Sequence, residues 1–98
     1  MNPVISHVPS LIRVRLLHPA RLFEGGYGID DEGWKTVRAR FRIRDDSGRV
    51  LLLSEPVSSG PVRRFSVPLT GQRELLLEVL AEGSIIGGQV NWVELSAK

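Results

Sequence analysis

The stretch TVRARFRIR, Thr36–Arg44, decides the fold class of this chain. Apolar side chains occupy its odd positions and polar side chains its even positions, without a break, from one end to the other. This period of two is typical of a β-strand that packs one face on a core and turns the other to solvent. The same alternation runs through residues 12–16, where arginines separate Ile12, Val14 and Leu16. We therefore predict at least two half-buried strands.

Turn signals divide the rest of the chain into short strands. RDDSGRV, residues 44–50, combines aspartate, serine and glycine, and predicts a turn that folds Thr36–Arg44 back onto Arg49–Ser54. EPVSSGP, PLTGQR and AEGSIIGGQ mark further breaks. Seven strands are expected, over residues 12–16, 21–27, 36–44, 49–54, 62–67, 74–80 and 90–95. Short strands at this spacing indicate an all-β sandwich or barrel.

Two segments leave local alternatives. Residues 73–81 contain good helix formers, but their short length and flanking turns favour a strand. Gly25 and Gly26 interrupt the strand expected over residues 21–27, which suggests a bulge or a close approach of two backbones.

Length and composition limit the class of protein. A chain of 98 residues is expected to form one domain, residues 1–98. It contains no cysteine, which excludes a disulfide framework and a cysteine-ligated zinc site. No apolar run approaches the length of a membrane span, so no membrane partner is expected. The net charge is only +2, and nucleic acid is not expected as a partner.

Several motifs together resemble a known family. HVPS at His7–Ser10 matches its H-x-x-S element, and GIDDE at Gly28–Glu32 matches its G-[IV]-D-[DE] element. RFRIRDDSGRV, the PLTG turn and the leucine-rich ELLLEVL follow in the family's order. GGQVNW at the end stands where the family has D-H-x-D-W, with Gly88, Gln89 and Asn91 replacing its acidic residues and histidine. The sequence thus resembles the NPCBM family, named for carbohydrate binding.

The resemblance carries expectations about fold and function. It implies an antiparallel β-sandwich, a jelly roll of the galactose-binding type, and a non-enzymatic carbohydrate-binding module with a glycan as partner. Family members are mostly extracellular, although no signal peptide precedes His7 in this sequence, so the compartment is left open.

The beginning of the chain suggests an alternative function. Compared with the family, the sequence is expected to be shortened at its N-terminus, with residues 1–10 as an arm and one sheet edge unpaired. An unpaired edge invites another strand. The alternative is therefore a structural or protein-interaction sandwich that forms a homo-oligomer, or pairs with a strand-donating partner chain, through this edge.

Candidate ligand-binding residues combine aromatic rings with polar neighbours. Indole and phenol rings stack on the apolar faces of sugars, while amides and carboxylates bond to the hydroxyl groups. Trp34, in an expected loop, is the best stacking platform. The other candidates are Tyr27, Asp30, Asp31, His7, Ser10, Gln89, Asn91 and Trp92. Competing structural interpretations are a core position for Trp92, loop caps for Gln89 and Asn91, and backbone hydrogen bonds for the His7–Ser10 pair.

No catalytic residue is assigned, because the sequence contains no Gly-x-Ser-x-Gly elbow and no recognisable oxyanion element. The acidic stretch Asp30–Glu32 raises the question of a structural calcium ion, which takes several oxygen ligands. Since a complete ligand pattern is lacking, a solvated turn is favoured and no cofactor is assigned.

An arginine stripe is the remaining candidate surface. Arg38, Arg40, Arg42 and Arg44 occupy alternate positions of one strand and are expected on one sheet face. Such a strip suits phosphate, sulfate or an acidic polymer. The favoured interpretation is an outer face whose arginines pair with glutamates of neighbouring strands.

Overall fold

The computed structural model describes residues 4–7, 10–31, 38–58, 61–82 and 88–98, and side chains for residues 11–29, 38–58, 61–80 and 90–98. The described residues form eight strands: β1 (Val4–His7), β2 (Ser10–Arg15), β3 (Leu22–Asp31), β4 (Arg38–Asp45), β5 (Val50–Leu53), β6 (Arg63–Pro68), β7 (Glu74–Glu82) and β8 (Gly88–Ala97). Among them no helix is long or apolar enough to cross a membrane.

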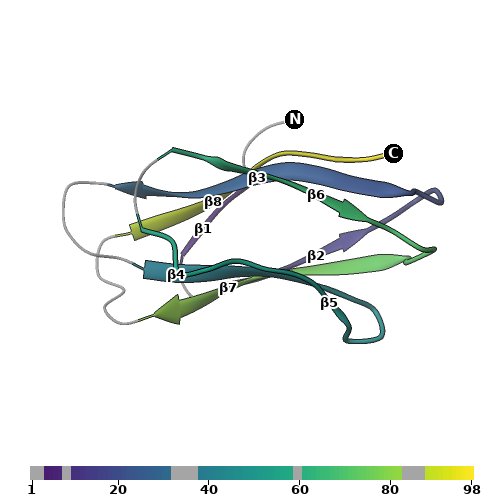
Figure 1. Ribbon diagram of the computed structural model, residues 1–98, viewed down its shortest axis with the longest axis horizontal. Helices are drawn as coiled ribbons and strands as arrows, with labels where there is room; N and C mark the ends of the chain where they lie inside the picture. The colour runs from purple at the N-terminus through teal and green to yellow at the C-terminus, as the bar shows by residue number, and fades with distance from the viewer. Residues whose placement is uncertain (1–3, 8–9, 32–37, 59–60, 83–87) are drawn as a thin grey trace.

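The strands form two four-stranded antiparallel sheets that stack face to face (Figure 1). Sheet 1 has the order β1-β8-β3-β6, and sheet 2 has the order β2-β7-β4-β5. Apart from the β4–β5 hairpin, neighbouring strands come from distant parts of the sequence, as in an eight-stranded jelly roll. The expected all-β antiparallel sandwich is confirmed, and the segment for which a helix was considered forms β7.

The structure describes one strand more than the seven expected. It lies within residues 1–10, which were expected to be an arm: Val4–His7 forms β1 and pairs with β8, from Val4 opposite Trp92 to His7 opposite Gln89. Ser10 already begins β2, opposite Val79 of β7. The four residues of β1 were missed because they are too few to display a period of two.

Strand β4 confirms the alternation from which the fold class was predicted. Ala39, Phe41 and Ile43 are fully buried, whereas the arginines between them remain partly accessible. β4 lies between β7 and β5, and an isolated bridge joins Ala39 to Val57. Its apolar face meets Leu75, Leu77 and Val79 of β7 in one shared core, each with 0% exposure.

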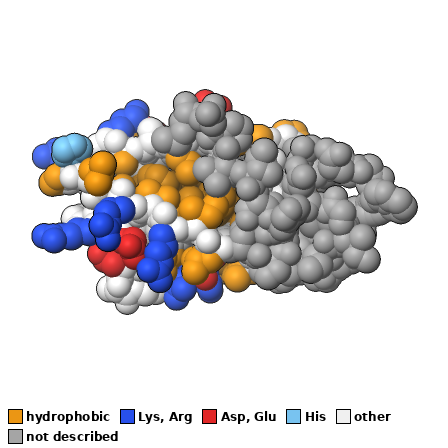
Figure 2. Space-filling model, turned by 180° about the vertical axis from the view of Figure 1, so that it is seen from behind, with side chains coloured by type: hydrophobic (Ala, Val, Ile, Leu, Met, Phe, Trp, Pro, Cys, Tyr) orange, Lys and Arg blue, Asp and Glu red, His pale blue; other side chains and the backbone are white. Residues whose placement is uncertain are grey.

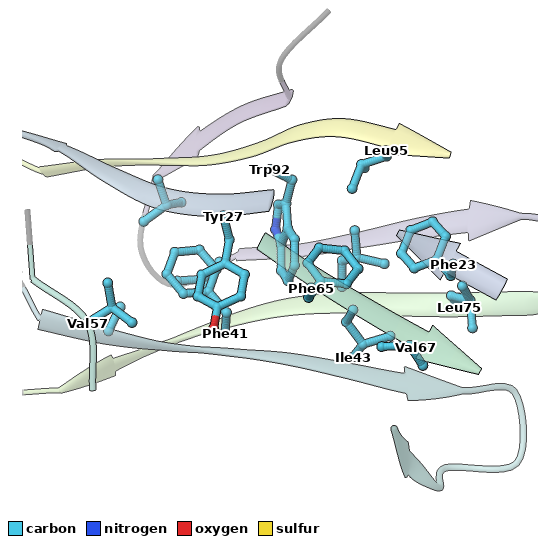
Figure 3. Close-up of a cluster of buried hydrophobic side chains, with 14 of the residues drawn as sticks. Phe23, Tyr27, Phe41, Ile43, Val57, Phe65, Val67, Leu75, Trp92 and Leu95 are labelled. Atoms are coloured by element: carbon cyan, nitrogen blue, oxygen red, sulfur yellow. The ribbon is translucent and has the colours of Figure 1, made fainter. Parts of the chain in front are cut away.

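Aromatic rings from both sheets fill the centre of the core (Figure 3). Tyr27 stacks on Phe41 with ring centroids 4.6 Å apart, and Trp92 meets Phe41 edge-on at 5.2 Å. Phe65 lies 6.1 Å from both Tyr27 and Trp92. Because β3, β6 and β8 belong to sheet 1 and β4 to sheet 2, these contacts hold the two sheets together.

A bulge between β3 and β8 explains the Gly25–Gly26 pair. The register shifts between Glu24 and Gly26, and Glu94 opposite has a φ of 51°, which non-glycine residues rarely adopt. A Cβ at Gly25 would lie 2.7 Å from Leu95 Cδ2 and 3.0 Å from the backbone oxygen of Val93, so there is no room for a side chain. β8 carries one extra residue at this bulge, which reverses the inward and outward alternation of its side chains. Leu95 is therefore buried although it lies three positions after the buried Trp92, an odd number.

The two ends of the sandwich differ. At the turn end, short turns join β2 to β3, β4 to β5 and β6 to β7. In the second of these turns Asp45 Oδ1 accepts hydrogen bonds from the backbone N–H groups of Ser47 and Arg49 and from Ser47 Oγ. These bonds lower the pKa of Asp45 to about 2. At the opposite end, called the loop end here, β1, β3 and β7 finish and β2, β4 and β8 begin (Figure 1).

Candidate ligand-binding end

The strand register brings several candidate residues together at the loop end of sheet 1. His7 on β1 lies opposite Gln89 on β8, and Gln89 lies opposite Asp30 on β3. Asn91, two residues further along β8, lies opposite Gly28. Three strands that are far apart in sequence therefore contribute polar residue types to adjacent backbone positions. An imidazole, an amide and a carboxylate are groups that can exchange hydrogen bonds with sugar hydroxyls.

The remaining loop-end candidates lie close to this row. Asp31 is the last residue of β3 and faces Gly88, and Ser10 begins β2 on the other sheet. The side chains of His7, Ser10, Asp30, Asp31 and Gln89, and the whole of Trp34, lie outside the described part of the structure. For His7, Ser10, Asp30, Asp31 and Gln89, the structure therefore gives the backbone positions and strand partners but not the side-chain contacts.

Tyr27 and Trp92 lie in the core, and for Trp92 this is the structural interpretation drawn from the sequence. Trp92 has 0% and Tyr27 8% exposure, and both rings pack against Phe41 inside the core. A ring enclosed on its faces by other side chains cannot stack on a sugar. Trp92 is opposite Tyr27 in the register and next to Asn91 in the sequence.

Trp92 also carries an unusual polar atom. Its Nε1 is buried and has no hydrogen-bond acceptor among the described residues. A buried donor without a partner usually costs between about 1 and 3 kcal/mol. The apolar packing of the indole must outweigh this cost.

The acidic residues considered for calcium lie partly in a strand rather than in a loop. Asp30 and Asp31 end β3, while Glu32 lies outside the described residues. Within the described residues no three His, Asp or Glu side chains are grouped in a way that could hold a metal ion. The side chains of Asp30, Asp31 and Glu32 lie outside the described part of the structure, so it does not test calcium binding by them.

The arginine stripe is engaged by a glutamate of the neighbouring strand. Glu78 on β7 lies opposite Arg42, and its carboxylate accepts hydrogen bonds from both Arg42 (2.9 Å) and Arg44 (2.7 Å). Hydrogen bonding to Arg42 is the largest cause of the lowered pKa of Glu78, opposed by burial and reinforced by Arg44. Arg38 lies opposite Glu82 in the strand register. Arg40 is half-buried and also has an interaction partner. This is the cross-strand pairing favoured from the sequence, and it reduces the charge that the stripe offers to an anionic polymer.

The family model of the NPCBM/NEW2 domain matches residues 4–97. The chain belongs to this family. No match was found among curated protein sequences.

Solved structures share the fold of this NPCBM/NEW2 domain. One is a CBM51 from Clostridium perfringens GH95 in complex with methyl-galactose, with 21% identity and a TM-score of 0.84 over 98% of this chain and 69% of that one. The CBM51-2 and INT domains of Clostridium perfringens ZmpB give a TM-score of 0.85 at 18% identity, over 97% of this chain. A longer ZmpB structure, with an M60 catalytic domain and two CBM51 domains, gives 0.84 at 19% identity. The chain spans only 10% of that protein and 21% of the CBM51-2 and INT structure.

Three features of the structure were not anticipated from the sequence. These are strand β1, the left-handed conformation of Glu94 and an apolar groove at the turn end, between β2 and β8. The Gly25–Gly26 pair could have pointed to Glu94, since a bulge needs an extra residue on the opposite strand. The groove had no local signal, because it forms only where residues 14–20 meet Phe23 of β3 and residues 95–97 of β8.

Proposed function

We propose that this NPCBM/NEW2 domain is a non-enzymatic carbohydrate-binding module that holds a glycan at its loop end. Membership of the family over residues 4–97 is the observation that carries the proposal. The shared fold with CBM51 modules supports it, and one of these modules was solved with methyl-galactose.

Each loop-end residue has a proposed role. Asp30, Gln89 and Asn91 would bond to sugar hydroxyls, because carboxylates accept and amides both donate and accept hydrogen bonds. His7 and Ser10 would complete the polar rim, with Asp31 beside them. Trp34 would stack on the apolar face of a sugar ring. The backbone register of His7, Gln89 and Asp30 on three adjacent strands supports this assignment.

The test combines a glycan array with isothermal titration calorimetry. Methyl-galactose is the first probe, and the array extends the search to other sugars. Trp34→Ala is expected to weaken binding at least tenfold, and Trp34→Phe, which keeps an aromatic face, to weaken it much less. Asp30→Asn tests the hydroxyl contacts.

Asp46→Asn at the turn end is the matched control for Asp30→Asn. Asp46 is exposed, and among the described residues its carboxylate accepts one hydrogen bond, from the backbone N–H of Arg73. Its replacement should leave binding unchanged. Absence of binding to every sugar on the array, by a folded protein, would contradict the proposal.

A further inference from the structure

Arginines of two strands lie on the outer face of sheet 2. The even positions of β4 point away from the core, and residues directly opposite one another in a sheet share a face. The register carries this face across β7 to β2, where Ile12 and Val14 pack against the core and the residues between them point outward. The outward positions hold leucines, three glutamates of β7 and six arginines, namely Arg13 and Arg15 on β2 and Arg38, Arg40, Arg42 and Arg44 on β4.

The net charge of this face exceeds that of the whole chain. Six arginines stand against three glutamates, with Glu82 counted by its register position opposite Arg38, so the outward positions carry +3. The whole chain carries +2. In Figure 2, Lys and Arg side chains line the lower side of the molecule, which is the sheet 2 side, towards the turn end. A face with this charge repels a second copy of itself and attracts an anionic partner.

Pairing between strands does not neutralise the face. Glu78 has a single carboxylate that accepts hydrogen bonds from both Arg42 and Arg44, so the three side chains together keep one positive charge. Arg13 and Arg15 are exposed, and neither forms an ion pair with the part of the chain that the structure describes. Positive charge therefore remains on both sides of β7.

Leu76 lies between two of these arginines. Arg13 and Arg44 are both opposite it, one on each neighbouring strand. Two strand spacings separate their backbones, about 10 Å. In the next row, Leu11 and Leu53 lie at the two edges of the sheet, and each is 54% exposed. The face therefore combines guanidinium groups with aliphatic side chains, and none of its outward positions described here is aromatic.

This cationic face is separate from the proposed glycan site. Arg13, Arg15 and Arg44 lie in the half of sheet 2 nearer the turn end, whereas the row of His7 and its neighbours belongs to sheet 1 at the loop end. The first and last strands, β1 and β8, also belong to sheet 1, on the other side of the sandwich (Figure 1).

We propose that the outer face of sheet 2 binds a sulfated polysaccharide, at a second site beyond the loop end. Guanidinium groups form paired hydrogen bonds with such oxyanions, and Arg13, Arg15 and Arg44 hold sulfates on both sides of Leu76. The spacing across Leu76 is close to the length of a disaccharide, the repeat in which these polymers carry their charges. The leucines contact the C–H groups of the sugar rings. Nucleic acid fits less well, because its readers use aromatic stacking or an element that enters a groove.

The test measures heparin binding by isothermal titration calorimetry at low ionic strength. The double variant Arg13→Gln/Arg15→Gln should weaken binding roughly tenfold and make it less sensitive to salt, since fewer counterions are released. The matched control Arg63→Gln/Arg64→Gln removes two exposed charges from β6 of sheet 1, and should weaken binding by less than about threefold. Equal losses in the two double variants, or no heparin binding by the wild type, would overturn the proposal.

Further titrations identify the partner and separate the two sites. Desulfated heparin should bind much more weakly than heparin, and a single-stranded oligonucleotide should also bind more weakly; a tighter oligonucleotide would assign the face to nucleic acid and overturn the proposal. Excess methyl-galactose should not displace heparin, and displacement would place the polymer at the loop end instead. Arg13→Gln/Arg15→Gln should bind neutral sugars as the wild type does. Heparin binding without binding of any neutral sugar would contradict the proposed function alone.

Discussion

Replacing Trp92 tests whether this tryptophan belongs to the core or to a ligand surface. Its ring is 0% exposed and lies 5.2 Å from Phe41, 6.0 Å from Tyr27 and 6.1 Å from Phe65, measured between ring centroids. Trp92→Ala removes the largest fully buried side chain and leaves a cavity between the sheets. Such truncations cost about 3–5 kcal/mol.

The magnitude can be compared with the stability of the whole domain. Small domains have unfolding free energies of about 5–15 kcal/mol, so Trp92→Ala should remove a large share of the stability of this domain. For a chain of this size, about 4 kcal/mol lowers Tm by about 15–30 °C. Trp92→Phe keeps most of the apolar contact and removes the Nε1 donor that has no acceptor among the described residues. We therefore expect it to cost only about 1 kcal/mol.

Thermal and urea unfolding of both variants, with glycan titration of Trp92→Phe, provide the measurement. The prediction is a strongly destabilised alanine variant and a phenylalanine variant that retains both stability and glycan affinity. The reasoning would be refuted by an alanine variant as stable as the wild type. A phenylalanine variant with unchanged Tm but no glycan binding would equally place the indole in the ligand site.

Three further predictions concern other described residues. Glu94→Gly should stabilise the fold by about 1 kcal/mol, since glycine adopts the φ of 51° without strain, and a loss in urea unfolding would contradict this. Glu78→Gln should lower the free energy of unfolding by about 1–2 kcal/mol, because Arg42 and Arg44 lose the carboxylate that they share. An unchanged midpoint of urea unfolding would argue against this pairing. The pKa of Asp45 is lowered to about 2, so its stabilising effect is complete above its ordinary pKa of 3.8 and is lost as pH falls towards 2. Asp45→Asn should be less stable at neutral pH and should lose less stability than the wild type between pH 4 and 2, as acid titrations of unfolding would reveal.

The fold could be predicted from the sequence where a pattern is long enough to show its period. Thr36–Arg44 alternates without a break, and β4 buries the expected apolar set. Gly25 and Gly26 marked a bulge, and the register shift lies there. Both signals are local, so the sequence carries them in one place.

The parts that were missed depend on pairing between distant segments. β1 is defined by its partner β8, since four residues carry no period of their own. The burial of Tyr27 depends on the phase of β3 against Phe41 on the opposite sheet. Likewise, the row of His7, Gln89 and Asp30 exists only because β1, β8 and β3 become neighbours in the jelly roll. The sequence supplied the residue types but not their register.

The most direct test of glycan binding at the loop end is a map of backbone amide shifts by NMR during titration with the best glycan ligand from the array. The account predicts that the largest shifts occur at His7, Asp30 and residues 88–91. Amides of the Asp45–Arg49 turn, at the other end of the sandwich, should stay in place. Shifts centred on that turn end, or no shift with any glycan, would contradict the account.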